Sequence, residues 1–167
     1  MSFPLGTHSY LVGALENGPI VLDMVLKDFS ASDPFWDFRP NPERFSLREM
    51  VAHIADWNDI YRERIERTRD ESNPQLPNCD EGQIAMERDY AHSDPVENLR
   101  RYRETRKPLI DVVNGLTESD WDRIGTRQSL GEMTLGEQIA LCSAHDAYHI
   151  RQAVEYCDQW RLSAAMR

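Results

Sequence analysis

The sequence lacks the features of several large protein classes. No apolar run approaches the roughly 18 residues that a membrane span needs, and the first residues have neither the charged nor the long apolar segment of a signal peptide. The three cysteines, Cys79, Cys142 and Cys157, are an odd number without CxxC spacing, so they form neither a disulfide framework nor a zinc ribbon. No glycine-rich phosphate loop, paired-carboxylate motif or Ser-His-Asp arrangement stands out. These absences predict a cytoplasmic protein without a membrane-spanning segment.

Positive charge is also scarce. The chain of 167 residues has 19 Lys and Arg against 29 Asp and Glu, which gives a formal net charge of −10. Nucleic-acid binding depends on phosphate contacts, so this balance argues against it. The most basic run, residues 100–107, is interleaved with Glu104 and predicts a solvated helix face. The length and the 40% hydrophobic content predict one domain over residues 1–167, large enough to bury a core.

Four stretches have helical signals. We expect a first helical segment over residues 10–16, a break at Asn17-Gly18, and a main first helix from Pro19 to about residue 29. A second helix follows the capping box Ser46-x-x-Glu49 and ends near residue 68. A third runs from Asp94 and Pro95 to about residue 114, with a kink at Pro108. The last follows Thr134-x-x-Glu137 and reaches about residue 160.

The connections between these helices are long. Residues 69–93 contain prolines at positions 74 and 77, and we expect one short helix near 81–89. A connection of this length usually covers a site or crosses over the bundle. Residues 116–133 predict a loop with a turn of helix near 118–123. No convincing strand pattern appears. The sequence therefore predicts an all-α, four-helix bundle with long loops capping one end.

Three of the five histidines are placed to face the core. His145 and His149 are four apart on the last helix, on its apolar side, with Cβ atoms about 5–6 Å apart. His53 lies at the edge of the apolar arc of the second helix. Such residues either satisfy backbone carbonyls in a core or hold a metal ion, and the residues alone leave both interpretations open. His8 and His92 have no such partners and are expected at the surface.

Three motifs of the sequence resemble those of a known family. The motifs are Ser46-Leu47-x-x-Met50-x-x-His53-Ile54-Ala55-Asp56-Trp57, Thr134-Leu135-Gly136-Glu137 and His145-x-x-Tyr148-His149-Ile150-x-Gln152. They resemble the DinB/YfiT-like superfamily, whose members often have Trp where Phe45 stands here. The resemblance implies a four-helix bundle of up-down-down-up topology. It also implies one divalent metal held by three histidines, which carry over to His53, His145 and His149.

Three imidazoles leave at least one coordination position open, as in catalytic sites. Asp56 and Gln152 are candidates to hold a ligand's second nitrogen or a water, although Asp56 fits an exposed carboxylate better. Tyr148 and Trp57 are expected in the wall of the site, and Cys142 and Cys157 as packed thiols. Imidazole suits zinc, nickel, iron and copper alike, so the ligands do not decide the ion. For a member of this family we expect Zn²⁺ or Ni²⁺, with iron or manganese as alternatives.

The resemblance implies a stress or detoxification role with thiol-dependent chemistry. This would be transfer of a low-molecular-weight thiol to a small-molecule electrophile, or a thiol-dependent isomerisation. Two alternatives remain: a metal-dependent hydrolase using activated water, and a non-catalytic metal-binding stress protein. A pocket beside an open coordination position favours an enzyme, whereas a fourth protein ligand or a sealed site favours the non-catalytic protein. The resemblance also allows a homodimer.

Overall fold

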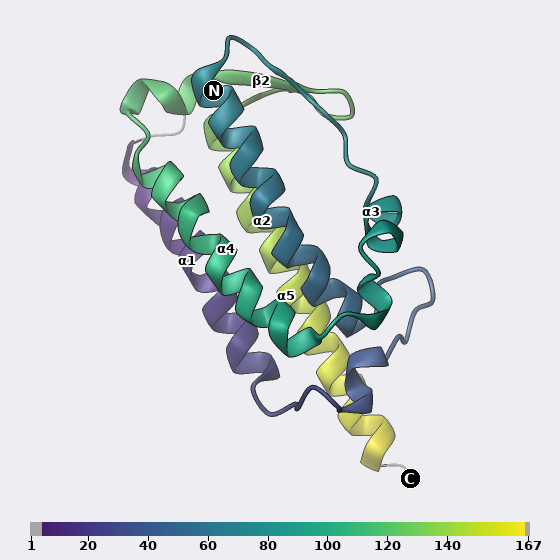
Figure 1. Cartoon of the computed structure of the whole chain (residues 1–167). Coiled ribbons are helices and arrows are strands. Elements are labelled where there is room, and N and C mark those ends of the chain that lie inside the picture. Colours follow the sequence, from purple (N-terminus) through teal and green to yellow (C-terminus); the bar gives the residue numbers. More distant parts are fainter. Residues whose placement is uncertain (1–4, 166–167) are drawn as a thin grey trace.

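Four long helices form the body of the computed structural model, which describes residues 5–165. They are α1 (Leu5–Leu26), α2 (Leu47–Asp70), α4 (Pro95–Asn114) and α5 (Leu135–Ala165). In Figure 1, α1 and α5 run in one direction and α2 and α4 in the other. α2 packs mainly on α4, and α1 mainly on α5. The predicted four-helix bundle and its up-down-down-up topology are confirmed.

The predicted helix starts are set by side-chain caps. The Ser46 hydroxyl accepts from the Glu49 N–H at 3.3 Å, while the Glu49 carboxylate accepts from the Ser46 N–H at 2.7 Å. Thr134 and Glu137 make the same reciprocal pair before α5, at 3.2 and 2.8 Å. Asp94 accepts from two N–H groups at the start of α4. These bonds satisfy donors that a helix start otherwise leaves unpaired.

The predicted break in the first helix is wrong. α1 continues through Asn17-Gly18 and contains Pro19 in its interior. Pro19 has no N–H to bond the carbonyl one turn earlier. The helix nevertheless continues because Leu15 before the proline and Leu22 after it are both fully buried. Packing on both sides of Asn17-Gly18 outweighs the local preference for a turn.

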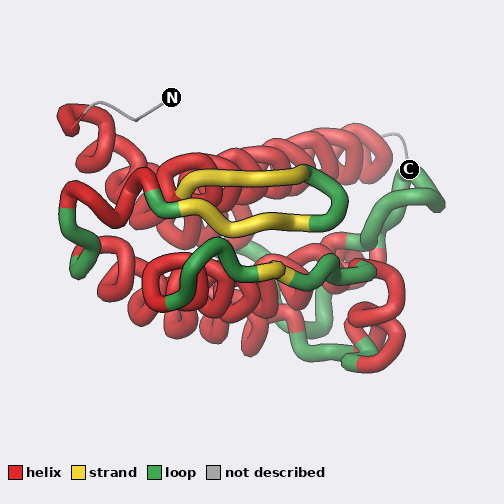
Figure 2. The backbone as a smooth tube through the Cα atoms, turned by 90° about the horizontal axis from the view of Figure 1, so that it is seen from above, coloured by secondary structure: helices red, strands yellow, loops and turns green. Residues whose placement is uncertain are grey.

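The helical bundle also has a small sheet, which the sequence did not predict. Strands β2 (Ile124–Arg127) and β3 (Gly131–Thr134) form an antiparallel hairpin, and β1 (Gln75–Leu76) pairs in parallel with β2. Figure 2 shows this sheet lying across one end of the bundle. Gly131 has φ +79°, a conformation that glycine adopts without strain. The strands have only two to four residues and no apolar alternation, so the sequence pattern does not reveal them.

The connections cover more of the bundle than the one expected end. The 3₁₀ helix η1 (Pro34–Asp37) buries Phe35 and Trp36 at the end away from the sheet. The predicted short helix is α3 (Glu81–Glu87), followed by the 3₁₀ turn η2 (Tyr90–His92), and it lies along one side of the bundle (Figure 1). A further 3₁₀ turn, η3 (Glu118–Asp122), is found where a turn was expected. Within residues 5–165, no helix has the length and apolar character needed to span a membrane.

The core divides into two clusters along the bundle. One includes Met50 and Ile54 of α2 with Ala153 and Tyr156 of α5. The other, nearer the sheet, includes residues such as Trp57 and Tyr61 of α2 with Ile139 and Cys142 of α5. On α5 the two histidines fall between the segments that supply these clusters, and on α2 His53 lies one turn before Trp57, the first α2 residue of the second cluster, so helix packing places the three histidines opposite one another.

Candidate metal centre

The three predicted histidines meet between α2 and α5. Each offers one ring nitrogen to a common group, and these atoms all lie within 4.8 Å of one another. Nε2 of His53 and Nε2 of His145 are 3.0 Å apart. Ring centroids are separated by 5.0 Å for His53–His145, 4.9 Å for His53–His149 and 4.6 Å for His145–His149. The structure thus brings together all three residues; that they bind a metal stays a prediction.

Burial keeps these imidazoles uncharged at neutral pH. Burial, together with the neighbouring His149 and His145, lowers the pKa of His53 from 6.5 to about 2. Burial, His149 and Arg106 together lower the pKa of His145 to about 3. The pKa of His149 falls to about 4, mainly through burial, although its hydrogen bond to Gln152 opposes the shift. Neutral imidazole is the form that coordinates metal ions.

The hydrogen bonds also orient the rings for a shared cation. His149 Nδ1 lies 3.0 Å from Gln152 Oε1, an acceptor, so this nitrogen carries the proton and Nε2 is left with its lone pair. His53 Nε2 and His145 Nε2 are at hydrogen-bond distance, so that one neutral ring donates to the other, whereas a divalent ion between them would be coordinated by the lone pairs of both. His53 Nδ1 is buried and has no hydrogen-bond partner among residues 5–165. Metal–nitrogen bonds of about 2.0–2.1 Å place ligand atoms roughly 3 to 4 Å apart. The donor set therefore fits a divalent ion.

Aromatic side chains enclose the histidines, as expected for the wall of the site. The Trp57 ring lies 4.0 Å from His53 and is stacked on His145 at 6.0 Å. Phe45 lies 5.2 Å from His53, and Tyr148 lies 5.0 Å from His149. These apolar surfaces limit the access of water to the imidazoles from those sides and lower the local dielectric.

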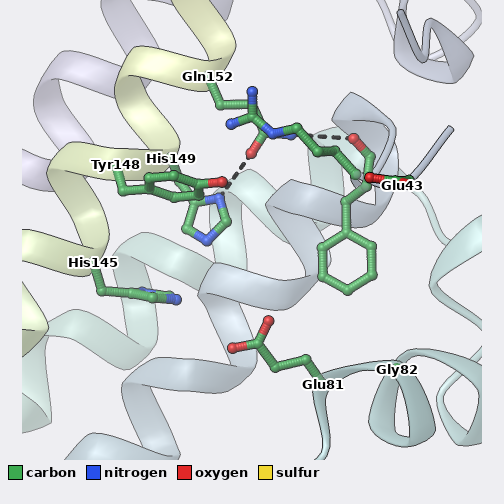
Figure 3. Close-up of a pocket in the computed structure, with 9 residues that line it drawn as sticks. Glu43, Glu81, Gly82, His145, Tyr148, His149 and Gln152 are labelled. Atoms are coloured by element: carbon green, nitrogen blue, oxygen red, sulfur yellow. Dashed lines mark hydrogen bonds between the residues drawn. The ribbon is translucent and has the colours of Figure 1, made fainter. Parts of the chain in front are cut away.

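One side of the centre opens into a cavity of about 490 Å³. Besides His145 and His149 it is lined by Glu43, Arg44, Phe45, Glu81, Gly82, Tyr148 and Gln152. In Figure 3 the Glu81 carboxylate, on the first turn of α3, points into the space below the two histidines. Burial and the neighbouring Asp80 raise the pKa of Glu81. No sequence pattern indicated Arg44 or Glu81 as site residues, although the length of the 69–93 connection did indicate a cover over a site.

Asp56 contacts neither the cavity nor a histidine. It is 1% exposed, so the expected surface position is wrong. Its carboxylate accepts a hydrogen bond from the Tyr90 hydroxyl and forms ion pairs with Arg88 and Arg101. These partners come from η2, the residue after α3, and α4. Asp56 therefore attaches the connection that carries Glu81 to the side of the bundle.

Gln152 occupies the position expected for a residue that orients a ligand. Its side-chain amide accepts from His149 and donates to the Phe45 carbonyl and the Tyr156 hydroxyl, both at 3.1 Å. Three fixed partners hold the amide in one orientation, and through it the His149 ring. A role in catalysis stays a prediction for Gln152.

The remaining histidines and cysteines lie away from the centre. His92 is exposed, as predicted, but His8 is half-buried and stacks on Trp121 at 3.6 Å between ring centroids. Cys142 and Cys157 are buried thiols, as predicted. Burial raises the pKa of Cys142, which keeps it protonated and unreactive. Cys79 is half-buried and 3.2 Å from Arg64 Nη2.

The family follows from comparison of the chain with known proteins. The model of the DinB superfamily matches residues 14–153. The chain belongs to the DinB superfamily. The structure of YfiT from Bacillus subtilis, described as a probable metal-dependent hydrolase with an unusual four-helix bundle topology, superimposes with a TM-score of 0.87. It covers 95% of this chain and 90% of YfiT at 20% identity, which supports the fold.

Two curated proteins of Oceanobacillus iheyensis are also similar, each named "Putative metal-dependent hydrolase". One is 23% identical over 107 residues, covering 64% of this chain and 61% of that protein. The other is 23% identical over 114 residues, covering 68% of this chain and 65% of that protein. The match thus spans less than two thirds of the length of either relative.

Proposed function

We propose that this DinB-superfamily protein is a metal-dependent hydrolase of a small molecule, with a divalent ion held by His53, His145 and His149. The observation that carries the proposal is the convergence of three neutral imidazoles beside an open cavity of about 490 Å³. Within residues 5–165 no fourth His, Cys, Asp or Glu joins this group. A pocket beside three ligands favours an enzyme over a non-catalytic metal-binding protein.

The names of the similar proteins favour hydrolysis over the thiol-dependent transfer or isomerisation expected from the sequence. A divalent ion at such a site supplies Lewis-acid chemistry, polarising a carbonyl and acidifying water. Side chains of the protein orient the ligands, exclude water and accept a proton. Gln152 orients His149, and the rings of Phe45 and Trp57 exclude water around His53. Glu81 presents the carboxylate that accepts a proton at the opposite wall.

Hydrolysis of a panel of esters and amides by zinc- and nickel-loaded protein tests the proposal, with and without added low-molecular-weight thiol. We expect turnover that needs the metal, does not need the thiol, and is lost in His149→Ala. Glu81→Gln keeps its metal and loses most of the rate, whereas Glu87→Gln, at the far end of α3, keeps both. Turnover that appears only with thiol would replace the hydrolase by the thiol-dependent enzyme.

A further inference from the structure

Arg44 lies in the wall of the cavity, two residues before the start of the capping box of α2. Its guanidinium carbon is 5.2 Å from the centre of the Tyr148 ring and 5.9 Å from that of Tyr156. Both rings belong to α5, the helix that supplies His145 and His149. The contacts place a permanent positive charge beside the candidate metal centre. Its field is one of the causes that lower the pKa of His149.

Most of the hydrogen-bonding capacity of Arg44 is unused. Nη1 forms one long ion pair, 3.5 Å from Glu155 Oε2. Nε and Nη2 are buried and have no hydrogen-bond partner among residues 5–165. Other arginines in the described chain leave a buried Nε unpaired, as Arg62, Arg106 and Arg127 do, but Arg44 leaves two nitrogens. Unpaired buried donors are unfavourable, so this pair is unusual for a purely structural arginine.

The two free nitrogens lie on one edge of the guanidinium. That edge presents two parallel N–H groups, which match the two oxygens of a carboxylate. We propose that the Nε–Nη2 edge of Arg44 binds a carboxylate of the substrate, so that the enzyme acts on compounds with a carboxylate near the bond that is cleaved. Only the claim that the bound compound is a substrate rests on the proposed function. The binding of a carboxylate by Arg44 does not depend on it.

The charges around the cavity favour a carboxylate over a phosphate. Glu43 and Glu81 also line it, so a doubly charged phosphate is repelled more strongly than a singly charged carboxylate. Access to the guanidinium edge requires a small movement, because Nε and Nη2 are shielded from solvent. Tyr148, which is 46% exposed and stacked on Arg44, is the side chain free to move aside.

Binding of simple probes tests the inference without turnover. The full chain, zinc-loaded and after chelation, is titrated with butyrate, with butyramide and with inorganic phosphate at constant ionic strength. Binding is followed by the Nε–H signal of Arg44 and the backbone amides of the cavity in nuclear magnetic resonance spectra. We expect butyrate to shift the Arg44 Nε–H signal and to bind at least about tenfold more tightly than butyramide or phosphate.

Variants of Arg44 separate the hydrogen-bonding edge from its charge. Arg44→Gln weakens butyrate binding at least about tenfold in both forms of the protein. Arg44→Lys keeps the charge without the paired donors and recovers only a minor part of the butyrate affinity that Arg44→Gln loses. Arg151→Gln is the matched control, because Arg151 also contacts Tyr148, at 5.8 Å, and Glu155, at 3.6 Å, but is exposed and does not line the cavity. It leaves butyrate affinity within about twofold.

Several outcomes would contradict carboxylate binding by Arg44. No shift of the Arg44 signal in wild type, equal binding by Arg44→Gln, or equal weakening by Arg151→Gln overturns the inference. Tighter binding of phosphate replaces the carboxylate by a phosphate group and overturns the substrate class. The two proposals fail separately. Butyrate binding that depends on Arg44 in a protein that takes up no metal would contradict the proposed hydrolase but not this inference. Metal-dependent hydrolysis in a protein whose butyrate binding does not depend on Arg44 would contradict this inference but not the hydrolase.

Discussion

Two buried polar centres occupy neighbouring positions on α5, and they are built on opposite principles. His145 belongs to the histidine cluster. The next residue, Asp146, points to another side of the helix and pairs with Arg106 of α4 at 2.7 Å. Arg106 also donates to the Tyr102 hydroxyl at 3.0 Å. The side chains of Arg106 and Asp146 are only 3% and 5% exposed.

The difference lies in how each centre satisfies its own groups. Asp146 and Arg106 are opposite charges; burial raises the pKa of Asp146, and the guanidinium opposes that shift. The two charges of this centre neutralise each other, although Arg106 Nε has no hydrogen-bond partner among residues 5–165, and the centre lines no part of the histidine cavity. The histidine cluster instead gathers three groups of the same kind, with ring nitrogens turned toward one another and one side open. A pair of opposite charges that neutralise each other needs no ligand, whereas three converging imidazoles beside a cavity indicate ligand binding.

Breaking the Asp146–Arg106 pair should have the largest effect on stability. Asp146→Ala leaves Arg106 charged and buried, so we expect the free energy of unfolding to fall by about 3–5 kcal/mol, a drop in Tm of roughly 6–20 °C for a chain of this size. Metal content measured at low temperature stays at the wild-type value. Thermal denaturation checks the first part, with Asp158→Ala as control, because Asp158 is 68% exposed and pairs with Arg161 at only 3.8 Å. A drop below about 1 kcal/mol in Asp146→Ala would contradict the account.

Acid should destabilise the histidine centre in the metal-free protein. The three folded-state pKa values, about 2, 3 and 4, lie below the ordinary 6.5. Below pH 6.5 the unfolded chain binds protons that the folded chain does not, so stability falls as the pH falls toward 4. Each histidine lowers the free energy of unfolding by about 1.4 kcal/mol for each pH unit below 6.5, and the three together lower it by up to about 4 kcal/mol per pH unit.

Urea unfolding of chelated protein from pH 7.5 to 5 measures this loss. His53→Gln should make the slope smaller by about one proton. Bound zinc should move the loss to lower pH, because the ion competes with protons for the same nitrogens. A slope in His53→Gln identical to wild type would show that this imidazole is not buried in neutral form.

Gly18 tests how closely the Asp146 centre is packed. A Cβ at this position would lie 2.7 Å from the Tyr102 hydroxyl and 2.8 Å from Asp146 Oδ2. Gly18→Ala should therefore destabilise the protein by about 1–3 kcal/mol, although alanine favours helix. Gly13→Ala, on the same helix, meets nothing within 4 Å and should stabilise it by about 0.5–1 kcal/mol. Equal effects of the two variants in denaturation curves would contradict this packing.

Replacing Gln152 should have an effect confined to the histidine centre. Gln152→Ala removes the acceptor that fixes His149 Nδ1, and we expect zinc affinity to fall by about 10–100-fold. Competition with a chromophoric chelator measures it. Gln159→Ala, exposed on the same helix, is the control and should bind zinc as wild type does. Unchanged affinity in Gln152→Ala would assign Gln152 to packing alone.

Local signals predicted the parts of the fold that local chemistry determines. Ser46 and Thr134 mark helix starts because their caps involve residues three positions away. The break predicted at Asn17-Gly18 failed for the opposite reason. Gly18 is required by Tyr102 and Asp146, which lie far along the chain, and not by a turn. The sheet was missed because its strands are too short to show a pattern.

The candidate site also has residues that local sequence predicts and residues that only the tertiary structure brings to it. His145 and His149 are detectable because helical spacing places them together, and the position of His53 follows from the apolar face of its own helix. Arg44 and Glu81 reach the cavity only through the paths of two irregular connections, which no periodicity describes. Asp56 was misplaced because its partners Tyr90, Arg88 and Arg101 approach from connections and helices distant in sequence.

Elemental analysis of purified, untagged protein tests the central claim most directly. Wild type is compared with His53→Ala and His145→Ala after incubation with zinc or nickel, and circular dichroism confirms that each variant is folded. The account predicts close to one metal ion per wild-type chain and a large loss in both variants. Wild type without metal, or folded variants that retain all of it, would contradict a three-histidine centre and the hydrolase proposed from it.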